Sequence, residues 1–308
     1  MKGDFFAGWT ELRAGGKRAA TTFLREATMH DKASESERAA AAIFARYRRN
    51  DAPRPVEWNE TLDIILRHRS HRAFLPEKLP EGALETIVAA AQSASTSSNL
   101  QVWSVVAVED KDRKARLAEL AGGQQHVRDC ATFLIWLSDL ARLENLARRE
   151  GREAKALPYL ELFLTGVVDA ALAAQNAVTA LESLGLGCVY IGAMRNHPEE
   201  VAKELDLPPN VFAVFGMAVG VPDPAVGTDV KPRLGQAAVL HREQYAWGEA
   251  QLDAVDTLDV KFRDFQREQG LPEQGWIRQV LSRVRGPEAM SGRDRLREAL
   301  AALGVALR

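Results

Sequence analysis

The sequence predicts one main domain in which helices and strands interleave, with helical segments at both ends. The 308 residues are 46% hydrophobic, so the chain can bury a large core while staying near the upper size of a single domain. Helix-like and strand-like stretches alternate through the middle of the chain, whereas both ends show only helical patterns. We therefore expect a helical N-terminal extension over 1–55, a core over 56–248 and a C-terminal helical arm over 249–308.

The elements follow from local periodicity and from turn residues. Residues 1–52 predict two or three modest amphipathic helices, broken near Gly15-Gly16 and ended by Pro53 and Pro55. In the core we expect helices over 61–67, 80–94 and 111–120, and strands over 103–108, 132–137, 188–191 and 211–219. Beyond Tyr245 the chain is charged and amphipathic, has a Gly/Pro break over 270–275, and shows no strand pattern.

The longest periodic segment covers residues 160–184. Its stretch 166–178 has almost no charge and many small side chains. A helix that is apolar nearly all round is deeply buried or is shared between subunits. The pattern by itself fits a core helix of a monomer as well as a helix at a subunit interface.

Charge and cysteine content exclude several classes of function. A net charge of −2 carries no general attraction for nucleic acid or a membrane, and we expect neither partner. Cys130 and Cys188 have no CxxC spacing and the six histidines are scattered, which argues against a disulfide framework and against a metal site. No stretch approaches the length of a membrane span, and the first thirty residues lack a cleavable leader pattern. We expect a cytoplasmic protein.

Two basic clusters, His68 to Arg72 and Lys231 to Arg233, are the most informative local feature. Arginine offers a planar fork that matches phosphate oxygens, lysine adds a point charge, and serine adds a short donor. Either cluster alone is more typical of a solvated helix end than of a ligand site. Three further motifs accompany them in the chain: Ser95–Ser98, Gly122–Gln124 and Tyr190–Ala193.

In the order and spacing of these motifs, the chain from about Thr61 to Tyr245 resembles the nitroreductase superfamily. The resemblance is to the NADPH-dependent flavin reductases and oxygen-insensitive nitroreductases, which bind FMN. It implies an α+β fold with a central, mostly antiparallel sheet flanked by helices. It also implies an intertwined homodimer with two FMN sites at the subunit interface.

The resemblance implies specific roles for the residues that match the motifs. The residues expected to hold the FMN phosphate are His68, Arg69, Ser70, Lys231 and Arg233. Arg72 is expected at the pyrimidine edge of the flavin, where a cation stabilises the reduced ring. The residues expected to bond the ribityl chain or ring are Thr96, Ser97, Ser98 and Gln124. Backbone N–H groups near the reactive nitrogen are expected from Tyr190, Ile191, Gly192 and Ala193, although relatives often have a second glycine where this chain has Ala193.

Two assignments stay open. Glu161 matches a family glutamate near the flavin and is the one candidate for a catalytic side chain, but an acid at a helix N-terminus has the same pattern. The electron donor implied is NADPH, with NADH as an alternative. Candidate arginines for the 2′-phosphate are Arg195, Arg263, Arg267 and Arg278. Asp264, Glu268 and Glu273 surround the last three and are expected to weaken their field, so that the preference for NADPH is modest.

The resemblance therefore implies an FMN-dependent NAD(P)H oxidoreductase that passes two electrons to nitroaromatic, quinone or flavin acceptors. No residue distinguishes among these small-molecule acceptors. One alternative is a flavin-binding or sensing protein with little turnover. Another is a specialised flavin enzyme, such as a reductive dehalogenase, on the same scaffold. The role of the extension 1–55 is not given by the resemblance.

Overall fold

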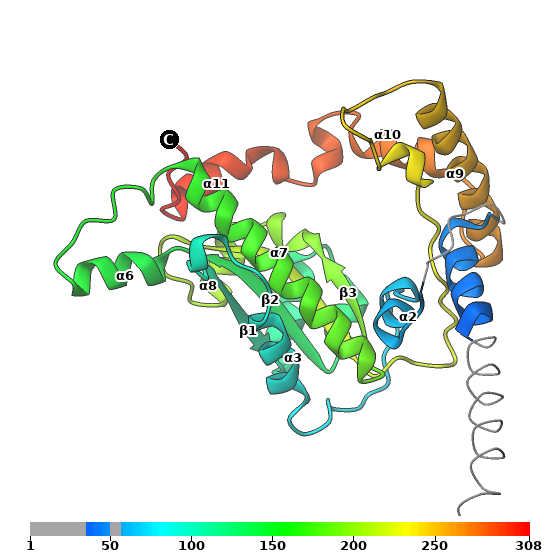
Figure 1. Cartoon of the computed structure of the whole chain (residues 1–308). Coiled ribbons are helices and arrows are strands. Elements are labelled where there is room, and N and C mark those ends of the chain that lie inside the picture. Colours follow the sequence, from blue (N-terminus) through cyan, green and yellow to red (C-terminus); the bar gives the residue numbers. More distant parts are fainter. Residues whose placement is uncertain (1–34, 50–56) are drawn as a thin grey trace, which may run out of the picture.

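A four-stranded sheet forms the centre of the computed structural model, which describes residues 35–49 and 57–308 (Figure 1). The strands are β1 (Trp103–Val108), β2 (Thr132–Asp139), β3 (Gly187–Ile191) and β4 (Val211–Gly220). Their order is β1-β2-β4-β3, and each of the three pairings is antiparallel. The four strands lie where the sequence predicts them, and the expected α+β fold with an antiparallel sheet is confirmed.

Helices surround this sheet. They are α2 (Glu60–Leu66), α3 (Ala83–Gln92), α4 (Lys111–Leu120), α5 (Gln125–Asp129), α6 (Ala141–Arg149), α7 (Leu160–Ser183), α8 (Pro198–Glu204), α9 (Glu249–Glu268), α10 (Trp276–Arg283) and α11 (Leu296–Ala302). A further helix covers residues 35–47. The helices predicted in the core correspond to α2, α3, α4 and α7. The break predicted at Gly15-Gly16 lies outside the described residues.

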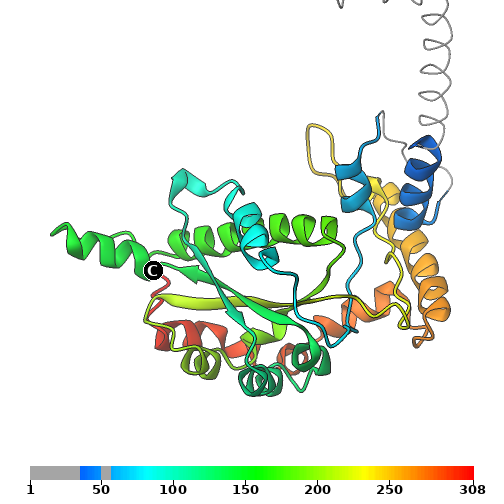
Figure 2. The same ribbon diagram turned by 90° about the horizontal axis from the view of Figure 1, so that it is seen from below.

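Both faces of the sheet are covered by helices. Strand β2 is largely apolar because its side chains are buried on both faces. Phe133 and Ile135 point into a core shared with α4, α5 and α8. Leu134 and Trp136 point into the opposite core, shared with α3 and α7. Because successive strand residues face opposite sides, a strand buried on both faces reads as a continuous apolar run. Figure 2 shows the sheet between the two layers of helices.

Small side chains let α7 lie close to its own sheet. Ala173, Ala174 and Ala177 are fully buried in the core beneath this helix. At Gly166 an added Cβ would lie 2.2 Å from the Ser138 Oγ of β2, so a larger residue would push the helix away. The small residues on this face of the helix therefore serve packing within the chain, as in a core helix.

The outer face of α7 is apolar and exposed. Leu160, Leu164, Val168 and Leu172 follow each other at intervals of four residues and keep 43–50% of their surface exposed. Residues four apart lie on one face of a helix, so they form a continuous stripe. We call these four residues the α7 stripe.

The length of α7 corrects one expectation. The sequence was expected to contain no stretch as long as a membrane span, but α7 has 24 residues and a hydropathy of 1.3, enough to cross a membrane by length and composition. Its buried face packs along the sheet of this chain instead.

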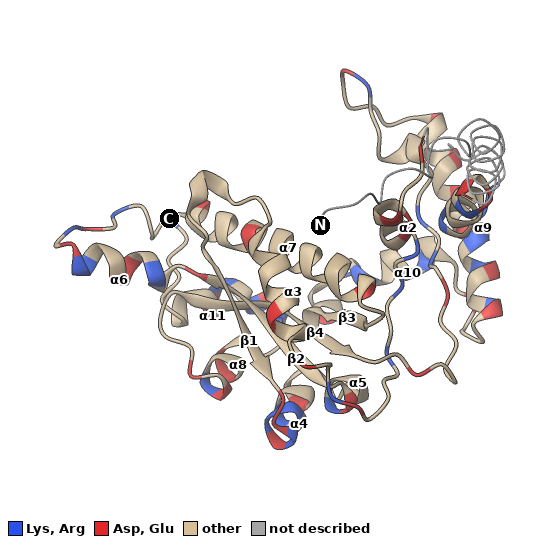
Figure 3. Ribbon diagram, turned by 60° about the horizontal axis from the view of Figure 1, so that its bottom comes forward, with Lys and Arg blue, Asp and Glu red and all other residues tan. Residues whose placement is uncertain are grey.

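The C-terminal residues leave the sheet and then return to it. Helix α9 lies beside the 35–47 helix, α10 packs on α9, and α11 lies back at the sheet (Figure 1). There Leu300 and Val305 pack on Phe212 and Val214 of β4. Residues 249–308 contain no strand, as predicted. Charged side chains gather on the outer helices such as α4, α6 and α9, whereas the strands and the middle of α7 carry almost none (Figure 3).

Candidate cofactor site

The first basic cluster is fixed along the edge of β3. It follows the end of α2, and the His71 N–H donates to the Cys188 carbonyl (2.9 Å). Gly187 makes room for this approach, because a Cβ there would lie 2.8 Å from the His71 ring. On its other side, the Thr228 hydroxyl donates to the Ser70 carbonyl (3.3 Å).

The second basic cluster, Lys231 to Arg233, lies against the first. The two clusters face a common pocket of about 330 Å³, which we call the basic pocket. Its lining includes all six residues expected at the phosphate and the pyrimidine edge: His68, Arg69, Ser70, Arg72, Lys231 and Arg233. Helix α9 and the turn after it contribute Phe265, Gln269 and Leu271.

The arginines and the lysine of the basic pocket have no acidic partner in the part of the chain that the structure describes. Among the described residues, no ion pair involves Arg69, Arg72, Lys231 or Arg233. Burial lowers the pKa of Lys231, and the neighbouring charges of Arg72 and Arg233 lower it further. The buried Nε of Arg69 has no hydrogen-bond partner. Like charges and an unsatisfied donor around one cavity fit an anion with several acceptor oxygens, such as a phosphate monoester.

The acids at this pocket pair with residues other than Arg69, Arg72, Lys231 and Arg233. Asp229 lies 3.2 Å from Arg48, and Glu182 of α7 lies 2.6 Å from the Nδ1 of His68. The contact with Glu182 occupies one ring nitrogen of His68 and leaves Nε2 to face a ligand. These two carboxylates therefore do not neutralise the three arginines and the lysine of the pocket.

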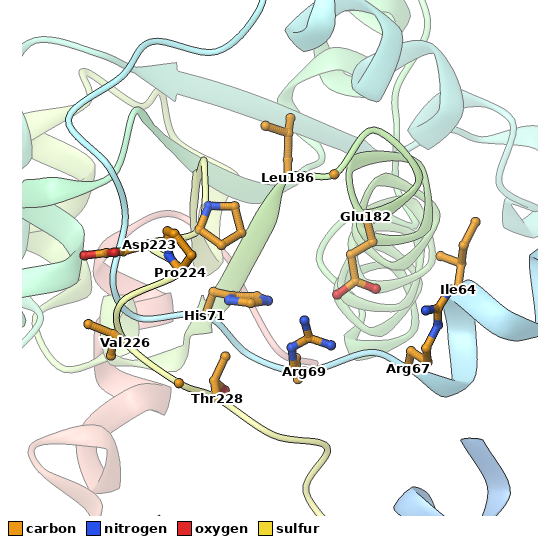
Figure 4. A pocket seen from close by; sticks show the side chains of 13 residues that line it. Ile64, Arg67, Arg69, His71, Glu182, Leu186, Asp223, Pro224, Val226 and Thr228 are labelled. Atoms are coloured by element: carbon orange, nitrogen blue, oxygen red, sulfur yellow. The ribbon is translucent and has the colours of Figure 1, made fainter. Parts of the chain in front are cut away.

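A second pocket of about 490 Å³ adjoins the first and shares Arg69 and His71 with it. Figure 4 shows these two side chains between Glu182 on one side and Thr228 on the other. Burial and the charge of Arg69 lower the pKa of His71 below its ordinary value. Both effects favour the neutral form of the His71 ring.

The loop of Thr96, Ser97 and Ser98, which we call the hydroxyl loop, lies apart from the basic pocket and is organised by Asp169. This buried carboxylate of α7 accepts from the Thr96 hydroxyl (2.5 Å) and from the Ser97 N–H (3.2 Å). Ser98 and Asn99 have positive φ angles of 49° and 55°. Asp169 is a functional candidate that was not predicted from the sequence. The signal was present, since it is the single charge within 166–178.

The remaining flavin candidates also lie outside the basic pocket of the same chain. The Gln124 amide donates to the Ala121 carbonyl (2.8 Å) at the start of α5. Tyr190 is the second-to-last residue of β3, with its ring edge-on to Phe215, and Gly192 and Ala193 begin a 3₁₀ turn. Ile191, the buried last residue of β3, lies between Tyr190 and Gly192. Glu161 is exposed in the first turn of α7. Within one chain the structure thus brings together the phosphate candidates and Arg72, whereas the other flavin candidates lie outside this pocket.

The arginines proposed for the dinucleotide are already engaged, with one exception. Arg195 donates to the Val214 carbonyl. Arg263 pairs with Asp259 (2.8 Å), which also accepts from the Ile277 N–H and so closes the α9–α10 turn. Arg278 is exposed and forms no ion pair with any other described residue.

Arg267 lies between two of the acids expected to weaken it. Its guanidinium pairs with Asp264 (3.1 Å) and with Glu273 (2.8 Å). Glu268, the third acid, pairs instead with Arg48. The local field at Arg267 is therefore partly cancelled before any ligand arrives.

Comparison with known proteins identifies the family. The nitroreductase family matches residues 65–221, and its C-terminal domain matches residues 231–308. An "FMN reductase (NADPH)" of Bacillus subtilis is 39% identical over 228 residues, which cover 73% of this chain and 91% of the relative. An "NADPH-flavin oxidoreductase" of Vibrio harveyi is 36% identical over 230 residues, which cover 74% and 92%.

Solved structures agree with this assignment. The NfrA1 nitroreductase of B. subtilis superposes with a TM-score of 0.75 at 36% identity and covers 80% of this chain and 99% of its own. The V. harveyi NADPH:FMN oxidoreductase complexed with NAD+ gives a TM-score of 0.72 at 34% identity and covers 81% and 100%. The chain belongs to the nitroreductase family.

Proposed function

We propose that the chain is an FMN-dependent NAD(P)H oxidoreductase that delivers two electrons to a small acceptor. One observation carries the proposal: four cations that pair with no carboxylate of the described residues converge on the basic pocket. Relatives named FMN reductase and NADPH-flavin oxidoreductase support it. Acceptors of the nitroaromatic, quinone and flavin classes all remain open to the enzyme, because stacking on a flat ring discriminates weakly.

In this proposal the basic pocket binds the cofactor through its phosphate. Arg69 and Arg233 supply planar forks, Lys231 supplies a point charge, and His68 and Ser70 supply single donors. Arg72 lines the same pocket and would stabilise the reduced ring through its charge. When bound, FMN supplies the redox chemistry, since its ring system takes two electrons from the dinucleotide and passes them on. In this proposal the side chains of the pocket bind FMN, orient its ring and stabilise its reduced form.

We further propose a homodimer in which two chains complete each site. The α7 stripe is a run of exposed apolar side chains, which is typical of an interface. The hydroxyl loop, Gln124 and the 190–193 turn lie outside the basic pocket of their own chain, and a second chain would bring such groups to the ring. Size-exclusion chromatography with light scattering tests the dimer, since a monomer of 33.9 kDa that retains FMN contradicts it.

Two organisational points are part of the proposal. The chain divides into the extension 1–55, the FMN-binding core 56–248 and the arm 249–308. The enzyme works in the cytoplasm, because Cys130 and Cys188 are buried free thiols, as in proteins of a reducing compartment.

The visible spectrum of the purified protein tests the proposed function. We expect flavin absorption that bleaches anaerobically with NADPH and returns when menadione or a nitrofuran is added. Steady-state oxidation of NADPH with the same acceptors then separates an enzyme from a flavin-binding protein with little turnover. A colourless protein that takes up no FMN, or a flavoprotein that neither dinucleotide reduces, contradicts the proposal.

A further inference from the structure

Arg46 connects the two basic clusters through three backbone carbonyls. Its Nη2 donates to the carbonyls of Leu66 (2.8 Å) and His68 (2.9 Å), and its Nη1 donates to the carbonyl of Lys231 (3.1 Å). In return, the Arg46 carbonyl accepts from the Arg233 N–H (3.0 Å). Arg46 lies in the last turn of the 35–47 helix and is only 7% exposed.

This connection opposes a repulsion. Arg69 and Arg72 on one segment face Lys231 and Arg233 on the other, and no carboxylate pairs with any of the four among the described residues. Like charges in a partly buried site repel one another, so the empty pocket tends to open. A rigid guanidinium fork that bonds both backbones holds the two segments at a fixed separation, which a flexible lysine does not do.

The same helix is anchored to α9 by Arg48. Its guanidinium pairs with Glu268 (2.6 Å) and with Asp229 (3.2 Å), and it lies 5.4 Å from the centre of the Phe265 ring. Both Asp229 and Phe265 line the basic pocket. Figures 1 and 2 show the 35–47 helix beside α9 in both views.

The 35–47 helix lies outside the residues that match the family. Both family matches lie within residues 65–308. The NfrA1 structure is covered over 99% of its length by only 80% of this chain, so one fifth of this chain has no counterpart in it.

We propose that the 35–47 helix supports the cofactor site from outside the pocket and that Arg46 is a positioning residue for its phosphate-binding segments. The inference rests on the proposed function. Arg46 acts through the backbone of His68 and Lys231. Loss of its guanidinium should therefore weaken the contacts with the phosphate and leave the contacts with the flavin ring intact. The consequence is specific: Arg46 sets the preference for FMN over riboflavin, which has the same ring and ribityl chain but no phosphate.

The test compares both flavins on the full-length protein. Apoprotein of the parent, of Arg46→Met and of Arg46→Lys is titrated with FMN and with riboflavin by fluorescence quenching, and thermal unfolding of each apoprotein is recorded. Arg38→Met is the matched control, because Arg38 is exposed on the same helix and lines neither pocket. Arg46→Lys keeps the charge but loses the fork, and serves also if Arg46→Met does not fold.

We expect the loss of these bonds to weaken FMN binding by about tenfold or more in Arg46→Met, with Arg46→Lys intermediate. Riboflavin affinity and the Arg38→Met control should stay at the parent's values. Unchanged FMN affinity in both Arg46 variants overturns the inference, and so does an equal loss for both flavins, which marks a general structural role. A parent that binds neither flavin refutes the proposed function itself, which separates the two failures.

Discussion

Two groups of arginines in this chain look alike in the sequence and differ in their surroundings. Those of the basic pocket, such as Arg69 and Arg233, are surrounded by other cations and form no ion pair with a described residue. Those of the arm, Arg263 and Arg267, pair with carboxylates of their own helix or of the turn after it. The first group lies beside a cavity, whereas the second closes a turn or lies on the surface.

The comparison teaches that unpaired charge, more than the residue type, marks an anion site. Keeping cations together without acids is unfavourable in the empty protein, and a bound anion relieves that repulsion. A surface arginine that already has a carboxylate gains little from a ligand, since such exposed pairs contribute only about 0–1 kcal/mol. Four variants test this difference.

Removing two forks from the basic pocket should have the largest effect. Each charge-assisted bond contributes about 1.5–3 kcal/mol, so Arg69→Ala with Arg233→Ala should weaken FMN binding by about a hundredfold or more. The measurement is flavin content after purification, followed by titration of the apoprotein. The matched control is Arg267→Ala with Arg278→Ala on the arm, which should keep its flavin. Full flavin occupancy in the pocket double variant would show that the phosphate binds elsewhere.

Lys231 should make FMN binding depend on pH. Burial and two neighbouring arginines lower its pKa in the empty protein below 10.5, and a bound phosphate favours its protonated form. Affinity for FMN should therefore be flat below the lowered pKa and fall as the pH rises above it, by at most about tenfold per pH unit for one linked proton. Titrations at pH values up to 10.5 measure the slope. In Lys231→Met the slope should vanish, and an identical slope there would exclude Lys231 as its source.

Arg48 should matter because it keeps two acids neutralised beside the basic pocket. Arg48→Ala frees Asp229 and Glu268, whose charges then oppose the phosphate, and we expect FMN binding to weaken by about three- to tenfold at low salt. High salt should shrink the effect. Adding Asp229→Asn should restore much of the affinity, and failure of that second change to help would mean that Arg48 acts through packing on Phe265.

The smallest effect is expected at Arg267. Asp264 and Glu273 already hold its guanidinium, so Arg267→Ala should lower kcat/KM for NADPH by only about two- to threefold and leave NADH unchanged. Glu273→Gln should shift the ratio the other way. Equal losses with both dinucleotides, or a parent that strongly prefers NADH, would remove Arg267 from the recognition of the 2′-phosphate.

Much of the fold could be predicted from local patterns. The four strands and the helices α2, α3, α4 and α7 lie where periodicity places them, because alternation and the 3.6-residue repeat follow directly from which side of an element is buried. Short surface helices such as α6 and α8 were not predicted, since seven to nine residues are too short a window for a periodic pattern to be recognised.

The site divides in the same way. The two basic clusters could be picked out because each is contiguous in the sequence and matches a family motif. Asp169 stands out as the single charge within 166–178, but its partners in the 96–97 loop could not be predicted. Arg46 could not be picked out, since it is one polar residue whose partners Leu66, His68 and Lys231 lie far away along the chain.

By itself, the sequence determined the order of helices and strands, the positions of the basic clusters and the resemblance to the family, all of which depend on short-range patterns. The tertiary structure alone decided which charges are neutralised, which face of α7 is exposed and how the 35–47 helix joins two distant segments. The physical reason is that an ion pair or a hydrogen bond acts over a few ångströms in space. Which residues come within that distance depends on how the whole chain packs.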